Sequence, residues 1–155
     1  MEYAAVLPSP LPGGWRLGIV EGQATLLAID YLSPEVSVKA PSTPLAREAA
    51  GQLGRYFVQP DFEFHLPLAP VGTAYQRRVW SALCTITPGR TCRYGELAGR
   101  LGSSAQAIGN ACRANPIPIV IPCHRVVAAA GPGGYMGQRA GAALSIKQWL
   151  LVHER

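Results

Sequence analysis

The sequence is poor in charge, with 15% of its 155 residues charged, and no apolar run approaches the roughly 18 to 20 residues of a membrane-spanning helix. Its first residues lack the basic segment that opens a secretory signal. The hydrophobic content of 48% is too high for a disordered chain, and no collagen-like repeat occurs. We therefore expect a compact cytoplasmic protein that makes no membrane contact.

Cysteine is absent before position 84, and the later cysteines stand outside any CxxC spacing. They are Cys84, Cys92, Cys112 and Cys123. Without an export signal we expect them to stay reduced rather than to form disulfides. The sequence shows no metal-ligand cluster, so we predict neither a metal nor a cofactor. One of the thiols is left as a candidate nucleophile.

Acidic residues are scarce in the second half of the chain. Residues 1–71 carry seven acids and four bases, a net charge of −3, whereas residues 72–155 carry two acids and ten bases, a net charge of +8. A Pro-rich stretch at 66–70 precedes the change, and we divide the chain there into two domains, 1–71 and 72–155. A strongly basic half is typical of nucleic-acid binding, although a basic, merely soluble surface explains the charge equally well.

The first domain has the pattern of a small sheet with one helix. Apolar segments at 3–6, 15–20 and 24–31 predict strands, and Glu21-Gly22-Gln23 predicts a hairpin turn. Apolar residues then recur at helical spacing over 45–57, before Pro60. No motif of catalysis or metal binding occurs in this part, so we interpret it as a scaffold.

The second domain has the spacing of a helix-turn-helix. A helix at 73–84 is followed by short helices at 94–101 and 105–114, which are separated by Gly102-Ser103-Ser104. The last helix is built mostly of small residues, with Gln106, Asn110 and Arg113 as its polar positions. Small residues suit close packing against a neighbouring helix, but in a basic domain they also suit close approach to a DNA groove.

The segment 115–126 brings a cysteine and a histidine together. Its prolines predict an extended ribbon that fixes the position of Cys123, and His124 follows directly. Because neighbours in a strand point to opposite faces, we expect a water to bridge them unless the chain turns there. An acid should orient the imidazole, and only Glu96 and Glu154 are available after residue 71. Glu154 follows an amphipathic helical segment, whereas Glu96 is expected on a solvated face. The alternative for Cys123 is a buried structural thiol.

The same segment, Asn-Pro-Ile-Pro-Ile-Val-Ile-Pro-Cys-His-Arg-Val, resembles the active-site signature of the O6-alkylguanine-DNA alkyltransferases. The resemblance covers residues 72–155, and residues 1–71 fit the family's N-terminal domain in outline. It implies an α/β protein, with a small ribonuclease-H-like α/β domain followed by a mainly helical, winged-helix-like domain that carries the helix-turn-helix. It also implies a single-turnover repair protein that flips an O6-alkylguanine out of double-stranded DNA, with O4-alkylthymine as a second candidate substrate. We expect a monomer, and cooperative binding of several molecules to DNA is compatible with it.

The resemblance implies a role for individual residues. Cys123 takes the alkyl group, His124 acts as base through a water, and Glu154 orients His124. Tyr94 gives a proton toward N3 of the departing guanine, and Asn115 ties the helix-turn-helix to the active-site segment. The implied substrate-binding residues are Cys112, Val126, Tyr135 and Met136. The implied DNA-binding residues are Arg93, Tyr94, Gln106, Ala107, Asn110, Arg113 and Arg125.

The sequence departs from the family pattern at three places. Gln106 stands where the family usually has an arginine that fills the space of the flipped base, and glutamine lacks the charge and reach of arginine. The connection after Tyr94 is about two residues short, and residues 138–143 have the character of an insertion. The absence of cysteine from residues 1–71 excludes the structural zinc site of some relatives. A weakened flip leaves a non-catalytic alkylguanine-binding or regulatory protein as one alternative, and a thiol hydrolase is another.

Overall fold

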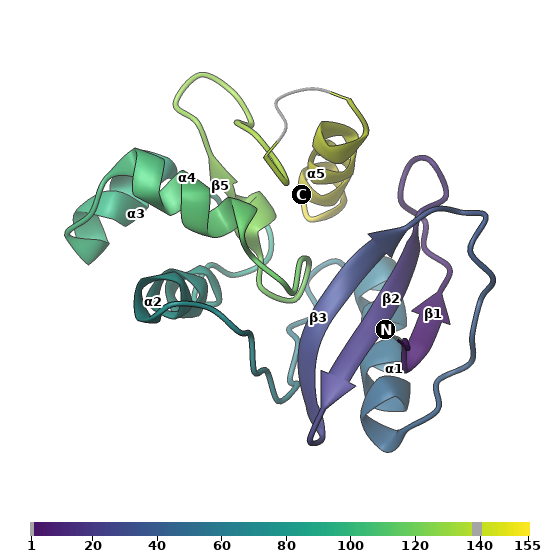
Figure 1. Cartoon of the computed structure of the whole chain (residues 1–155). Coiled ribbons are helices and arrows are strands. Elements are labelled where there is room, and N and C mark those ends of the chain that lie inside the picture. Colours follow the sequence, from purple (N-terminus) through teal and green to yellow (C-terminus); the bar gives the residue numbers. More distant parts are fainter. Residues whose placement is uncertain (1, 138–140) are drawn as a thin grey trace.

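A three-stranded antiparallel sheet opens the computed structural model, which describes residues 2–137 and 141–155 (Figure 1). Its strands are β1 (Ala5–Leu7), β2 (Arg16–Gly22) and β3 (Thr25–Leu32), in the spatial order β1-β2-β3. The tight turn between β2 and β3 confirms the predicted hairpin. The three predicted strands are likewise present, with slightly later bounds.

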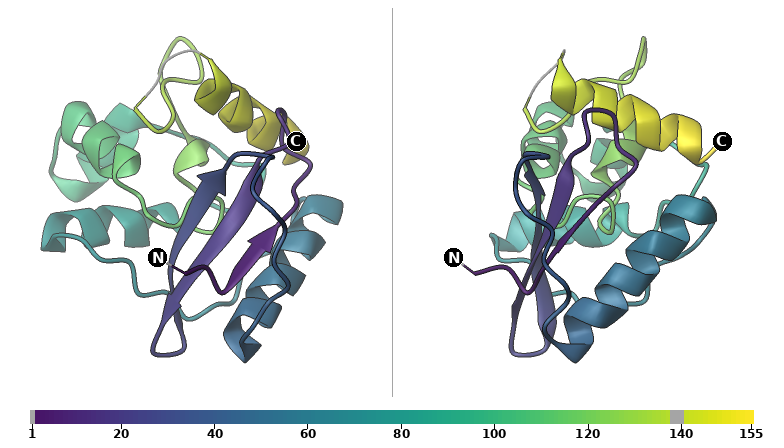
Figure 2. Two further views of the ribbon diagram at one scale, coloured as in Figure 1. Left: turned by 45° about the vertical axis from the view of Figure 1, so that its right-hand side comes forward. Right: turned by 90° about the vertical axis from the view of Figure 1, so that its right-hand side faces the viewer.

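Helix α1 (Pro44–Val58) packs on one face of this sheet, as Figure 2 shows. Thr43 caps the helix, because its side chain accepts a hydrogen bond from the backbone of Ala46, and Pro44 suits the first turn, where its missing N–H is not needed. The buried face of α1 includes Leu53 and Tyr56. The predicted helix at 45–57 is confirmed, and it brings Tyr56 into the interior of the molecule.

Helix α2 (Ala74–Leu83) begins at the predicted N-cap. Thr73 and Gln76 form a capping box in which each side chain bonds the backbone of the other residue. The indole Nε1 of Trp80, on the buried face of α2, donates a hydrogen bond of 2.8 Å to the backbone oxygen of Ala111. This bond and the burial around it fix α2 against α4 (Ala105–Arg113), the helix that contains Ala111.

The helix-turn-helix prediction is confirmed by α3 (Tyr94–Leu101) and α4 (Ala105–Arg113). Gly102 ends α3 in the left-handed conformation, with a φ of 63°, which glycine adopts without steric cost. Ser104 then caps α4 through its side chain. A short parallel pair, β4 (Cys92–Arg93) and β5 (Val126–Val127), joins the start of α3 to the segment that follows Cys123.

The prediction of an extended ribbon over the proline-rich segment is wrong. Residues 116–121 fold into successive turns, with a hydrogen bond of 2.9 Å from Ile121 N to Ile117 O and a positive φ of 73° at Ile119. A proline φ is compatible with turns as well as with extended chain, and burial of the isoleucines decides between them. The segment then enters a short 3-10 helix, η1 (Cys123–Arg125).

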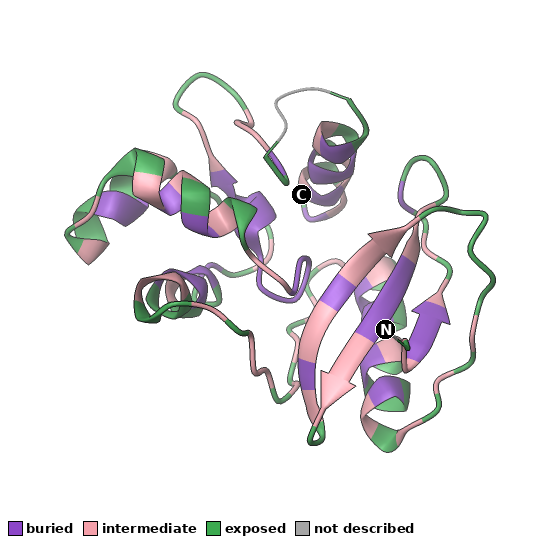
Figure 3. Cartoon of the chain, in the orientation of Figure 1, coloured by how far each residue is buried: buried purple, intermediate pink, exposed green. Residues whose placement is uncertain are grey.

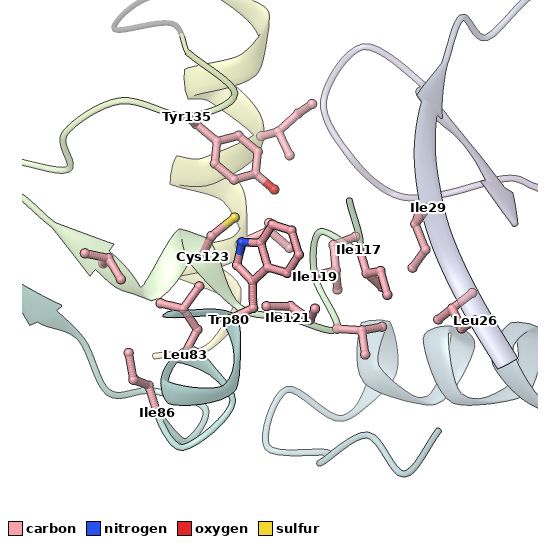
Figure 4. Close-up of a cluster of buried hydrophobic side chains, with 14 of the residues drawn as sticks. Leu26, Ile29, Trp80, Leu83, Ile86, Ile117, Ile119, Ile121, Cys123 and Tyr135 are labelled. Carbon is pink, nitrogen blue, oxygen red and sulfur yellow. The ribbon is translucent and has the colours of Figure 1, made fainter. Parts of the chain in front are cut away.

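The core is shared between the two halves of the chain. In Figure 4 Leu26 and Ile29 of β3 lie at one end of a buried cluster, the isoleucines of the turn segment lie between, and Cys123 and Tyr135 lie at the other end. A hydrogen bond of 3.0 Å from Ile29 N to Pro116 O attaches the turn segment to β3. The N-terminal unit therefore packs directly behind the segment that carries the candidate nucleophile.

Helix α5 (Ala142–His153) completes the fold; it packs against η1, and its Trp149 and His153 contact the aromatic residues Phe57 and Tyr56 of α1. Its buried positions follow one face, while the rest is exposed or half-buried (Figure 3). Of the predicted insertion at 138–143, residues 138–140 lie outside the described residues, and Ala142 and Ala143 belong to α5. Among residues 2–137 and 141–155, no helix is long and apolar enough to cross a bilayer.

Candidate active site

Cys123 is the first residue of η1, and Asn115 holds its sulfur. The Asn115 Nδ2 atom donates hydrogen bonds to Cys123 Sγ at 3.2 Å and to the backbone oxygen of Ile121 at 2.8 Å. Asn115 follows α4, so this contact links the helix-turn-helix to the thiol. Burial raises the pKa of the Cys123 thiol, while the Asn115 hydrogen bond and the charge of Lys147 oppose that rise. The resting group is therefore a thiol that needs a base.

His124 is fully buried, and its Nε2 atom lies 2.8 Å from Glu154 Oε2. Because η1 is a 3-10 turn rather than a strand, the side chains of Cys123 and His124 are not on opposite faces as strand neighbours would be. Burial lowers the pKa of His124, and Glu154 offsets this in part, so the imidazole is neutral near pH 7. Among the described residues its buried Nδ1 atom has no hydrogen-bond partner, so this nitrogen remains able to accept a proton.

Glu154 caps the end of α5 and is held by several donors. Arg125 donates from Nε to Oε1 and from Nη2 to Oε2, both at 2.9 Å, and the Tyr56 hydroxyl donates to Oε2 at 2.6 Å. Burial alone would raise the pKa of this carboxyl, but the hydrogen bonds from His124 and Arg125 outweigh it and hold the pKa well below the usual range. Glu154 is therefore ionised whenever His124 needs an acceptor. Glu96 caps α3 on the exposed surface, so of the two acids it is Glu154 that contacts His124.

The placement of Arg125 corrects a sequence-based expectation. Its guanidinium is buried between Glu154 and the backbone oxygen of Ile86, to which Nη1 donates at 2.6 Å. A side chain 7% exposed and paired in this way cannot reach a DNA phosphate. The resemblance implied a DNA contact for Arg125, but a position in a sequence motif does not determine which way the side chain points.

A cavity of about 700 Å³ lies between α4 and the loop before α5, and Cys123 borders it. It brings together most of the residues predicted for the base pocket and for DNA. These are Tyr94, Gln106, Asn110, Cys112, Arg113, Tyr135 and Met136. A second cavity, of about 480 Å³, adjoins it at Cys123 and Tyr135 and is bounded by Ile29 and Tyr31 of β3.

Other predicted residues lie outside the first cavity. Arg93 is exposed at the N-cap of α3, and Ala107 is half-buried on α4. Val126 is buried and does not line the first cavity, and its backbone oxygen accepts a hydrogen bond from Lys147.

The loop before α5 packs tightly against Tyr94. Gly133, with a φ of 77°, passes so close to Tyr94 that a Cβ at this position would lie 2.9 Å from the tyrosine ring.

Lys147 is a residue of the site that the sequence interpretation missed. It is fully buried on α5, and Nζ donates to the backbone oxygens of Val126 at 2.7 Å and Gly134 at 2.9 Å, with the Tyr94 hydroxyl at 3.4 Å. Burial lowers its pKa to about 8. One signal was present: Lys147 falls on the same helical face as Ala143, Ile146 and Leu150, where a lysine is unusual.

Two tyrosines of the N-terminal unit also reach the site. Tyr31 of β3 shares a hydrogen bond of 2.8 Å with the Tyr135 hydroxyl, and Tyr56 of α1 bonds Glu154. These contacts join residues 104 and 98 positions apart. No local pattern in the sequence predicts contacts between residues so far apart. The N-terminal unit is therefore more than a remote scaffold, because it contacts both the pocket loop and the buried carboxylate.

A helix-turn-helix whose recognition helix lines a cavity with a buried thiol defines a DNA-binding protein that carries cysteine chemistry. Residues 74–155 match the family model described as 6-O-methylguanine DNA methyltransferase, DNA binding domain. The methylated-DNA–protein-cysteine methyltransferase of Methanosarcina acetivorans is 36% identical over 160 residues, which cover 98% of this chain and 97% of that protein. The constitutive enzyme of that name from Bacillus subtilis is 36% identical over 129 residues, 82% of this chain and 76% of that protein.

Solved structures agree with this match. The O6-methylguanine methyltransferase of Mycobacterium tuberculosis superposes with a TM-score of 0.79 at 32% identity, covering 96% of this chain and 90% of that one. A structure of Mycobacterium tuberculosis OGT in complex with DNA gives a TM-score of 0.78 at 34% identity, with the same coverage. The chain belongs to the O6-methylguanine DNA methyltransferase family. It is accordingly a DNA repair methyltransferase, and DNA is its partner.

Proposed function

We propose that the protein removes the alkyl group from O6 of an alkylated guanine in duplex DNA and keeps it irreversibly on Cys123. One observation carries this assignment: Cys123 borders a cavity whose lining also includes Gln106 and Asn110 of the recognition helix. A base swung out of the stack beside α4 would therefore enter a space that already contains the thiol. A volume of about 700 Å³ lies in the range of small-molecule sites.

The transfer is a single displacement. The sulfur attacks the alkyl carbon, the new S–C bond forms as the C–O6 bond breaks, and the bonding electron pair goes to the guanine. The thiol proton passes to Nδ1 of His124, with one water as the expected bridge. Glu154 accepts the other imidazole N–H, fixes the tautomer and stabilises the imidazolium that forms.

The guanine leaves as a neutral base when it gains a proton. Tyr94 lines the cavity and is the expected donor toward N3 of the guanine. The Lys147 ammonium, 3.4 Å from the Tyr94 hydroxyl, favours loss of that proton because it stabilises negative charge on the oxygen. Asn115 keeps the sulfur in place through the Nδ2 hydrogen bond.

The DNA-binding face is formed by exposed polar residues around α4. Gln106, Asn110 and Arg113 are exposed and line the cavity, and Arg93 is exposed at the start of α3. We assign Gln106 to the space that the flipped base leaves, and Arg113 and Arg93 to backbone phosphates. The protein acts as a monomer in the cytoplasm, where its DNA substrate lies.

The test is to incubate the protein with a duplex that contains one O6-methylguanine, to measure the intact mass and to map the modified residue. We expect one added methyl group per protein, on Cys123. The change is absent in Cys123→Ala and retained in Cys84→Ala, which removes an exposed thiol outside the site. Binding without a mass change would support the non-catalytic alkylguanine-binding protein, and repeated turnover of an ester or peptide would support the thiol hydrolase.

A further inference from the structure

Tyr56 touches the catalytic apparatus from the other half of the chain. Its hydroxyl donates to Oε2 of Glu154 at 2.6 Å, and that same oxygen lies 2.8 Å from Nε2 of His124. Tyr56 is fully buried and does not line the cavity beside α4. The proposed transfer assigns no role to Tyr56, although its hydroxyl shares the acceptor Glu154 Oε2 with the imidazole of His124, which is to act as the base.

The direction of this hydroxyl is fixed by packing. The Tyr56 ring lies 5.5 Å from the rings of Phe57 and Phe64 and 5.1 Å from that of His153, measured between centroids. His153 Nε2 also lies 2.8 Å from the backbone oxygen of Tyr56. Tyr56 therefore attaches to the last turn of α5 at two points, once through its backbone and once through its side chain.

Glu154 needs such an attachment because of its place in the chain. It is the C-cap of α5, and the last turn of a helix loses order more readily than its interior. Arg125 holds the carboxylate from one side through two hydrogen bonds. The Tyr56 hydroxyl adds a neutral donor, which fixes the carboxylate without bringing a further charge beside the imidazole.

The hydroxyl also keeps its proton throughout the reaction. Burial and the adjacent Glu154 raise the pKa of Tyr56 above its ordinary value, so it acts as a donor at every usable pH. By donating to Oε2 it withdraws negative charge from the atom that faces His124. The charged groups that act on His124 are Glu154, Arg125 and Lys147, and Tyr56 adjusts the first of these.

We infer that Tyr56 is a positioning residue for alkyl transfer: its hydroxyl holds Glu154 in the geometry that His124 requires, and it thereby couples helix α1 to the chemistry at Cys123. This inference rests on the proposed transfer to Cys123 and adds to it a residue from the N-terminal unit.

The test uses Tyr56→Phe, which removes the hydroxyl and keeps the ring. Transfer from an O6-methylguanine duplex is measured in single turnovers with saturating protein, across a pH series, and the affinity for DNA is measured separately. We expect the rate to fall about tenfold, toward the lower end of what a hydrogen bond to a charged acceptor contributes, because Arg125 still holds the carboxylate. DNA affinity should not change.

The pH series separates positioning from general loss of stability. Without the Tyr56 donor, Glu154 Oε2 carries more negative charge toward His124 and raises the pKa of His124. A larger fraction of the imidazole is then protonated at low pH, so the acid limb of the rate profile should move to higher pH. A rate profile that keeps its shape and its height would overturn the inference.

Two further variants complete the design. Tyr3→Phe is the matched control, since Tyr3 also donates its hydroxyl to a carboxylate, Asp30, at 2.7 Å in the same unit, and we expect the wild-type rate. An equal loss in Tyr3→Phe would overturn the inference. In a Glu154→Gln background, Tyr56→Phe should cause no further loss, and an undiminished second loss would also count against it. A wild-type protein that gains no methyl group would instead refute the proposed function itself.

Discussion

The buried ammonium of Lys147 predicts a pH dependence of stability that a second lysine does not share. Burial lowers its pKa in the folded protein to about 8, from 10.5 for an exposed lysine. The folded state therefore gives up this proton at lower pH than the unfolded state. Below about pH 8 the lysine is protonated in both states, and the folded state bears the full cost of the buried charge. Between about pH 8 and the ordinary pKa of 10.5 the folded state has lost the proton and the unfolded state has not, so the free energy of unfolding rises with pH over this range.

The magnitude follows from the two pKa values. With 1.36 kcal/mol per pKa unit, the contribution of Lys147 to the free energy of unfolding rises by about 2.5 kcal/mol between about pH 7 and about pH 10. Cysteines and tyrosines titrate in the same range, so the quantity to measure is the difference between the wild type and Lys147→Met. Urea unfolding at several pH values gives that difference. We expect the free energy of unfolding of the wild type to increase relative to that of Lys147→Met as the pH rises.

The control for this experiment is Lys39→Met. Lys39 is the only other lysine of the sequence, and its side chain is 38% exposed and paired with the exposed Glu2. The difference between the wild type and Lys39→Met should stay level over the same pH range, because folding does not bury the Lys39 ammonium as it buries that of Lys147. A level difference for Lys147→Met as well would refute the argument from burial.

Three other changes test the site. Gln106→Arg should repair O6-methylguanine faster and steepen the salt dependence of DNA binding by about one counterion, and an unchanged or slower rate would remove the argument about this position. Arg125→Ala should lower the free energy of unfolding by about 3 kcal/mol, because it leaves Glu154 buried without its cation, while the salt dependence of DNA binding stays the same; a shallower salt slope would return Arg125 to the DNA interface. Tyr31→Phe removes the hydrogen bond between β3 and the Tyr135 hydroxyl. It should raise the DNA concentration that gives half of the maximal single-turnover rate more than it lowers the maximal rate itself, and the reverse pattern would contradict a role of Tyr31 in shaping the pocket.

The features predicted best from the sequence are those that depend on neighbouring residues. The bounds of α2, α3 and α4 follow from caps that act within four residues, namely Thr73 with Gln76, Gly102 and Ser104. Only two acids follow residue 71, and the structure places one of them, Glu154, beside His124. These features depend on residues close together in sequence or on simple elimination, and both can be read without a structure.

Contacts between distant segments could not be predicted in the same way. The turns over 116–121 depend on where three isoleucines find apolar surface, and prolines alone permit either outcome. The contacts of Tyr31 and Tyr56 depend on how the sheet and α1 dock behind the active-site segment. Arg125 shows the same limit, because its burial is set by Glu154 and Ile86, which lie 29 and 39 positions away.

Burial of the thiol bears on why transfer ends with one product. Because burial raises the pKa of Cys123, a free thiolate is costly in this position, and in the proposed transfer the sulfur becomes nucleophilic only as His124 takes the proton. The alkylated sulfur is an uncharged thioether, which needs neither a base nor solvent and suits the buried position of Cys123. The same desolvation that restrains the starting thiol therefore imposes no cost on the product. Reversal would require a thiolate leaving group in a site that disfavours its charge, and that asymmetry favours a single, irreversible turnover.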